Sequence, residues 1–111
     1  GTARRDAWPE EGGLPGSDLK MMREQHLDRN NVALGILEPL GFGNSARNVE
    51  YGAALVAAVN EWQLDAFVDK EPRLRASIVV AQEDTAAAVA EIRRRAPDRR
   101  YAQIELTSLV A

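Results

Sequence analysis

The stretch LGFGNSARN, residues 40–48, has the spacing that comes closest to a ligand-binding motif. Within it, positions 41–46 fit the G-x-G-x-x-[G/A] form of a dinucleotide-binding turn. Such a turn places its glycines directly after a strand, and an acidic residue about 20 positions later ends the next strand. Here Glu38-Pro39-Leu40 separates the glycines from the preceding apolar run, and the expected acidic position falls inside a predicted helix. We therefore interpret the stretch as a connecting loop whose glycines permit backbone conformations that other residues rarely adopt, and we predict no nucleotide site.

Histidine is a frequent metal ligand and general base, and His26 is the only histidine of the chain. One histidine cannot form a metal cluster or a proton relay that is built from several histidines. His26 falls on the apolar side of a short predicted helix. We therefore predict that it is a packed structural residue.

Arginines gather in the stretch RRRAPDRR, residues 93–100, which is a candidate nucleic-acid surface. The alternative is a solvated helix end, where arginines complement the negative pole of the helix dipole. The chain has a formal net charge of −3, and Tyr101 is the one nearby aromatic side chain that could stack on a base. We favour the helix end and predict no nucleic-acid partner.

Polar side chains at the carboxyl ends of the predicted strands remain as candidates, because ligands of parallel α/β folds gather at that edge. Asp84 also lies there, but we assign it to a helix cap. The sequence offers no Ser/His/Asp arrangement, metal-ligand spacing or phosphate-binding loop, so we assign no catalytic residue. The residues that we predict to bind substrate are Glu38, Gln82, Glu83, Thr107 and Ser108.

The composition is that of one small globular domain, with 111 residues, 45% of them apolar and 28% charged. The net charge of −3 gives no general attraction to nucleic acid or to an anionic lipid surface. The absence of cysteine excludes disulfides and thiolate sites, and it fits a cytoplasmic protein. No stretch is long and apolar enough to span a bilayer, and none reads as a signal peptide, so we expect no membrane partner.

Residues 1–16 combine two prolines, four glycines and five charges, which predicts an irregular loop. Two interpretations of Trp8 within this segment stay open: part of a lid over a ligand site, or one packed aromatic of a surface loop. Residues 17–111 form the predicted domain. Both ends of the chain resemble cuts in a longer protein, so we expect a fragment.

The periodicity predicts a first helix over residues 17–30, which Asn30-Asn31 ends. The apolar run 32–37 has strand length and lacks polar alternation, so we expect a strand that is buried on both faces. The first helix has Ser17 as its predicted cap, and its predicted inward face carries Leu19, Met22 and His26.

The longest predicted helix covers residues 48–71 and ends before Pro72. A buried strand over residues 75–80 follows, then a helix over residues 84–96 that Asp84 caps, and a strand over residues 101–106. The predicted inward residues are Tyr51, Leu55, Val59, Trp62 and Ala66 in the long helix and Thr85, Val89 and Ile92 in the last one.

Strands and helices alternate in this order, which is typical of an α/β fold with a parallel sheet and right-handed crossovers. A free sheet of three parallel strands exposes its edges and one of its faces, and such sheets are normally covered or closed into a barrel. We therefore expect a partner for the sheet, either the remainder of a longer fold or another copy of the chain.

Several stretches together resemble the amidohydrolase-related family of metal-dependent TIM barrels, which includes aminocarboxymuconate-semialdehyde decarboxylase. The most telling features are Asn48 at the start of the long helix, Asn60-Glu61-Trp62 within it, and Pro72-Arg73-Leu74 before a strand. The resembling stretches are PGSDLKMMREQHLD, NVALGILEPL, NVEYGAALVAAVNEW and DKEPRLRASIVVAQEDTAAAVAEIRR.

The resemblance implies a partial (β/α)8 TIM barrel, of which this chain supplies about three strands and their helices; a whole barrel needs about 250 residues. It also implies a divalent metal, commonly zinc, in the complete parent only, and hydrolysis or non-oxidative decarboxylation of a small carboxylated or aromatic substrate. The family's His-x-His pair has no counterpart in this sequence. No metal ligand or catalytic residue is therefore transferred to it.

A second function class stays open beside the enzyme. The chain is then a non-catalytic α/β module that self-associates or binds a partner through its open sheet. The missing metal ligands permit this alternative, whereas the unmatched strands favour the barrel fragment.

Overall fold

The computed structural model describes residues 9–10, 12–13, 16–39 and 49–106. The chain divides into two compact units, residues 1–35 and residues 36–111. The sequence predicted a boundary at residue 16, between an irregular loop (residues 1–16) and the domain of strand–helix repeats (residues 17–111). This boundary lies within the first unit and stays a prediction. Among the described residues, no helix is long and apolar enough to cross a bilayer.

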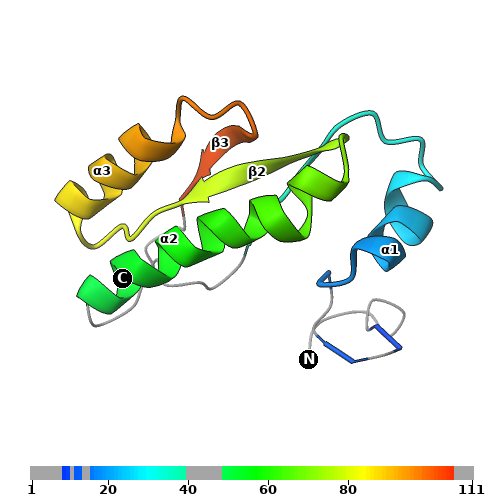
Figure 1. The fold of residues 1–111 in the computed structure, drawn as a ribbon, viewed down its shortest axis with the longest axis horizontal. Coiled ribbons are helices and arrows are strands. Elements are labelled where there is room, and N and C mark those ends of the chain that lie inside the picture. Colours follow the sequence, from blue (N-terminus) through cyan, green and yellow to red (C-terminus); the bar gives the residue numbers. More distant parts are fainter. Residues whose placement is uncertain (1–8, 11, 14–15, 40–48, 107–111) are drawn as a thin grey trace. The chain divides into compact units, whose positions relative to one another are not determined.

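The first unit contains one short helix, α1 (Leu19–Met22), which continues as the π-helical turn η2 (Arg23–Leu27) (Figure 1). Asp18 caps the helix, since its carboxylate accepts a hydrogen bond from the Met21 backbone N–H at 3.1 Å. The prediction of Ser17 as the cap was wrong, because Asp18 has an extended backbone that brings its own carboxylate over the first turn.

His26 is exposed, so the prediction of a packed histidine was wrong. The cause is the wide π-helical turn, in which the Asp28 N–H donates to the Arg23 carbonyl at 2.8 Å. This turn buries Leu27, which is 1% exposed, in place of its neighbour. Asn31 has a left-handed backbone, with φ at 50°, and breaks the helix where the sequence predicted.

The second unit is built on a parallel three-stranded sheet in the order β1 (Gly35–Ile36), β2 (Leu74–Val79), β3 (Tyr101–Glu105) (Figure 1). The predicted α/β class with parallel strands is thus confirmed. β2 and β3 match the predicted strands closely because both are short, mainly apolar segments bounded by turn residues. Their ladder contains one irregularity, between Ala76 and Ser77.

β1 is much shorter than the predicted strand over residues 32–37, and the prediction that it is buried on both faces was wrong. Leu34 and Ile36 are 54% and 44% exposed. β1 lies at an edge of the sheet, where β2 is its one neighbour. A strand in that place keeps a solvent-exposed flank, whereas the apolar run had suggested a central strand.

The helix α2 (Val49–Ala66) is followed by the 3-10 turn η3 (Val68–Lys70). Its predicted inward stripe was wrong at both aromatic positions, since Tyr51 is 62% and Trp62 45% exposed. Trp62 instead packs edge-on against Phe67, with ring centroids 5.3 Å apart. The helix turns a neighbouring face inward because two amide side chains on that face bind the β2 backbone. The buried residues of that face are Val56, Val59, Asn60, Gln63 and Leu64.

The helix α3 (Thr85–Arg95) begins as predicted, since the Asp84 carboxylate accepts a hydrogen bond from the Ala87 N–H at 3.0 Å. Its predicted inward face was wrong at two of three positions, since Thr85 is exposed and Val89 is 39% exposed, whereas Ile92 is half-buried. Two charged residues are buried there instead, because they form an ion pair with each other; they are Glu91 and Arg95.

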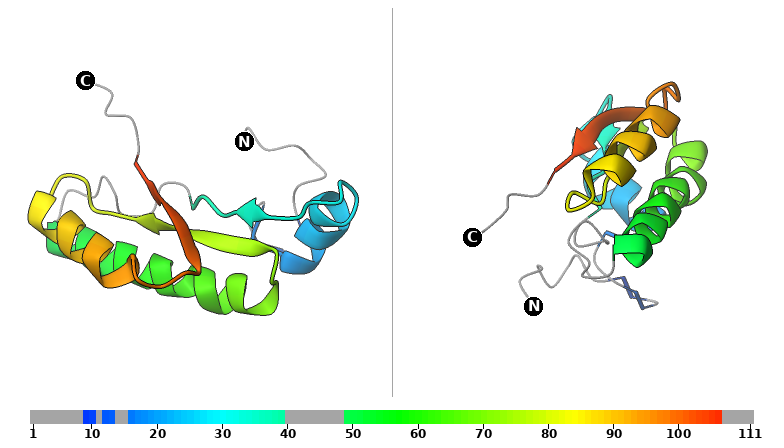
Figure 2. Two further views of the ribbon diagram at one scale, coloured as in Figure 1. Left: turned by 90° about the horizontal axis from the view of Figure 1, so that it is seen from above. Right: turned by 90° about the vertical axis from the view of Figure 1, so that its left-hand side faces the viewer.

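The core of the second unit lies between the two helices and β2. Figure 2 shows α2 and α3 on the same side of β2. Large apolar side chains elsewhere on the sheet stay exposed, as expected for an open sheet with helices on one side; they are Ile36, Ile104 and Leu106. The core cluster consists of Val56, Val59, Val79 and Ala81, with Leu55 packed against it.

Candidate functional site

Polar side chains from β2, β3 and the segment that follows β1 meet at one place in the second unit. The Gln103 side-chain amide donates to the Glu38 carboxylate at 3.3 Å and to the Ser77 hydroxyl at 3.0 Å. The Ser77 hydroxyl in turn donates to the Leu37 carbonyl at 2.6 Å. Glu38, which the sequence placed at the carboxyl end of a strand, is therefore held beside Gln103, the middle residue of β3.

Glu105, the last residue of β3, joins Glu38 at this edge. Burial raises the pKa of the Glu105 carboxyl, and the negative charge of Glu38 raises it further. Its Oε2 atom is buried and has no hydrogen-bond partner among the described residues. A carboxyl group with a raised pKa is the kind of group that general acid catalysis uses.

The sequence analysis missed Gln103 and Glu105. Both belong to the predicted strand over residues 101–106, and their two-residue spacing puts them on one face of that strand. That spacing was the available signal.

The other predicted substrate-binding residues are only partly placed. Gln82 and Glu83 lie in the turn between β2 and α3, where Gln82 is half-buried and Glu83 is exposed. Thr107, Ser108 and Trp8 lie outside the described residues, as does the glycine stretch 40–48. Their predicted roles stay predictions.

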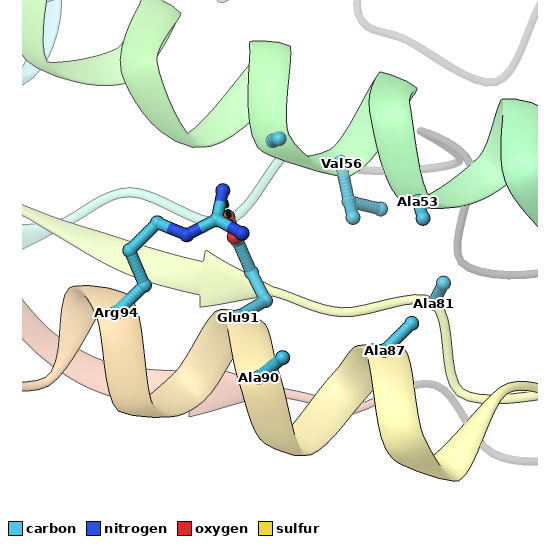
Figure 3. Close-up of a pocket in the computed structure, with 8 residues that line it drawn as sticks. Ala53, Val56, Ala81, Ala87, Ala90, Glu91 and Arg94 are labelled. Atoms are coloured by element: carbon cyan, nitrogen blue, oxygen red, sulfur yellow. Dashed lines mark ion pairs between the residues drawn. The ribbon is translucent and has the colours of Figure 1, made fainter.

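A hollow of about 110 Å³ lies between α2 and α3, as Figure 3 shows. Alanine methyl groups line most of it, and its charged members, Glu91 and Arg94, pair with each other at 3.3 Å. The lining contains no nucleophile or histidine. We interpret the hollow as loose helix packing and not as the site.

A buried polar network ties α2 to α3. Arg95 donates from Nε to the Glu91 carboxylate at 3.0 Å and also bonds to Glu61. The Asn60 amide donates to the same Glu91 carboxylate at 2.8 Å. Burial opposes the charge on Arg95, but its hydrogen bonds to the two carboxylates outweigh burial and raise its pKa. The network is a scaffold that holds the two helices together.

The basic run is not a continuous positive surface. Arg95 is buried, so the prediction of a solvated helix end was wrong for this residue, whereas Arg93 and Arg94 are exposed as predicted. Arg100 binds Asp98 at 2.7 Å and Asp69 at 2.9 Å. These hydrogen bonds raise the pKa of Arg100, and the one from Arg100 lowers the pKa of Asp98.

Tyr101 gives the fold a pH dependence. Its hydroxyl donates to the Asn60 carbonyl at 2.8 Å, and burial raises its pKa to about 12. The unfolded phenol titrates near pH 10, so this stabilisation is complete below about pH 10 and is lost as the pH rises to about 12. We expect the urea midpoint to fall over that window, and to fall less in Tyr101→Phe. The matched control is Tyr51→Phe, and an equal fall in both variants would contradict the assignment.

The residues described here do not fit a metal centre. No group of three His, Cys, Asp or Glu side chains that could hold a metal ion occurs among them. His26 is the single histidine of the whole sequence. Glu38 and Glu105 provide two carboxylates, fewer ligands than a protein metal site normally uses.

A family model with the description "Amidohydrolase" matches residues 4–110 of the chain. A comparison with curated proteins finds no match. The matched span contains both units and every element of the sheet.

Proposed function

The chain belongs to the amidohydrolase family, and from this premise we propose that it forms part of the barrel wall of a longer hydrolase. The single observation that carries the proposal is the family match over residues 4–110. The parallel β2–α3–β3 unit supports it, because (β/α)8 barrels repeat this unit. Three strands are fewer than the eight that close such a barrel.

We place the substrate at the carboxyl ends of the strands, where barrel enzymes build their sites. Glu38 supports this placement because it follows the carboxyl end of β1, where Gln103 donates a hydrogen bond to its carboxylate. Glu105 would be the candidate proton donor to a substrate group there, since burial raises the pKa of its carboxyl. The other residues proposed to line the site are Gln82, Glu83, Thr107 and Ser108, with Trp8 as a lid residue.

Members of this family typically bind a divalent metal, and we propose zinc for the complete protein. The described residues do not provide its ligands. Those ligands would come from other strands of the longer protein. The residues of this chain would position the substrate and form one wall of the site.

The proposed reaction is hydrolysis or non-oxidative decarboxylation of a small carboxylated or aromatic compound. Product analysis of the complete protein, incubated with a panel of such compounds, separates the two: decarboxylation releases CO2, whereas hydrolysis does not. We expect one of these activities, and we expect a chelator to abolish it. Turnover that persists in the chelator would contradict metal dependence.

The exposed side chains of Ile36, Ile104 and Leu106 favour a second candidate, a non-catalytic module that associates through its sheet. The same product analysis distinguishes the two functions. A complete protein that turns over no compound, but forms a stable assembly through these residues, would support the module.

A further inference from the structure

β1 stops pairing with β2 at Leu37. The Leu37 N–H donates to the Arg75 carbonyl at 2.9 Å, which is one rung of a parallel ladder. The next rungs of such a ladder join the Ser77 N–H to the Leu37 carbonyl, and the N–H of residue 39 to the Ser77 carbonyl. Residue 39 is a proline and has no N–H to give. The ladder therefore cannot continue in the usual way.

A broken ladder leaves the β2 backbone with unmet hydrogen bonds. Ser77 is 0% exposed, so water cannot satisfy its carbonyl. Each buried backbone group left without a partner costs about 1–3 kcal/mol. Some other donor has to reach this edge of β2.

Asn60 and Gln63 of α2 reach it with their side-chain amides, and we call this pair the amide clasp. Gln63 accepts from the Ser77 N–H at 3.2 Å and donates to the Ser77 carbonyl at 2.8 Å. Asn60 likewise accepts from the Val79 N–H at 2.8 Å and donates to the Val79 carbonyl at 2.9 Å. Both amides are 0% exposed. Each one reproduces the two hydrogen bonds that a neighbouring strand would make.

We propose that Pro39 and the amide clasp form a conformational stop that ends β1 at Leu37 and turns Glu38 toward Gln103. Pro39 prevents the chain from pairing further along β2, and the clasp stabilises the edge that is left. The Leu37 carbonyl, displaced from the Ser77 N–H, accepts from the Ser77 hydroxyl instead. Gln63 is in this account a positioning residue for Glu38. The stop is independent of the proposed function, because it rests on hydrogen bonds within the second unit.

A double-mutant cycle on the 111-residue chain tests the stop. Gln63→Met keeps the bulk of the side chain and removes both hydrogen bonds to Ser77. We expect it to lower the folding equilibrium constant roughly tenfold to a hundredfold, and Pro39→Ala alone to change it less than about threefold. In the Gln63→Met background, Pro39→Ala should raise the folding equilibrium constant roughly fivefold or more, because the N–H at position 39 can then reach the Ser77 carbonyl.

Where Gln63→Met does not fold, the double variant with Pro39→Ala should fold, because the N–H at position 39 can then reach the Ser77 carbonyl; a double variant that also fails to fold would contradict the stop. Amide exchange supplies a second readout. The Ser77 amide should exchange faster in Gln63→Met, or in the double variant where that is the one that folds, while the Ile78 amide, on the β3 side of the strand, changes little. Two results would overturn the proposal. One is that the effects of the two substitutions on the folding equilibrium constant simply multiply; the other is that exchange at the Ser77 and Ile78 amides accelerates equally.

Discussion

Asn60→Ala should lower the free energy of unfolding by about 3–5 kcal/mol. The Asn60 amide is fully buried and makes three short hydrogen bonds, two with the Val79 backbone and one with the Glu91 carboxylate. Alanine removes all three and leaves the Val79 N–H, the Val79 carbonyl and a buried carboxylate with fewer partners. It also leaves a small cavity, which adds to the cost. Urea denaturation followed by circular dichroism measures the difference.

The matched control is Asn30→Ala, the same change at an exposed asparagine whose side chain bonds to the His26 carbonyl. We expect this control to lower the free energy of unfolding by less than about 1 kcal/mol. Equal losses for the two variants would show that the Asn60 amide does not hold the edge of β2.

Arg95→Met should also lower the free energy of unfolding by about 3–5 kcal/mol. Arg95 and Glu91 are 8% and 5% exposed, and their ion pair spans 3.0 Å. Methionine keeps much of the side-chain volume but leaves the Glu91 carboxylate buried without its closest cation. Breaking a buried pair from one side is costly because the remaining charge is not solvated. The free energy of unfolding in urea is again the measurement.

Arg94→Met is the matched control, because Arg94 pairs with the same carboxylate but its side chain is 62% exposed. We expect Arg94→Met to lower the free energy of unfolding by less than about 1 kcal/mol. The double variant Glu91→Leu with Arg95→Met should recover part of the loss, since no buried charge is then left unpaired and the remaining partners, Arg94 and Glu61, are solvent-exposed. If Arg94→Met costs as much as Arg95→Met, burial is not what makes the Arg95 pair important.

The order of the elements and the parallel sheet could be predicted because their signals are local. β2 is a short, mainly apolar segment, and α3 begins at an aspartate whose side chain accepts from the N–H three residues later. Proline and asparagine marked the breaks. None of these inferences required knowledge of what the segment packs against.

The buried faces of the helices could not be predicted, because their partners are distant in the sequence. Asn60 bonds to a residue 19 positions away and Gln63 to one 14 positions away. Hydrophobic periodicity assigns such amides to solvent and aromatic residues to the core. α2 reverses both assignments, since Asn60 and Gln63 are buried and Tyr51 and Trp62 are exposed.

The candidate site was predicted in part. Glu38 could be found because it follows an apolar run that ends at proline, and strand ends collect ligands in this class of fold. Its partner Gln103 lies 65 positions away, so only the register of β1, β2 and β3 brings the two together. The raised pKa of Glu105 depends on burial by that same arrangement.

The most direct test of the central claim is the intact mass and metal content of the protein purified from the cells that make it. The claim is that this chain forms part of the wall of a longer metal-dependent barrel. It predicts a mass roughly two to three times the 12.2 kDa of these 111 residues, with about one equivalent of divalent metal. A species of 12.2 kDa that contains no metal would contradict it.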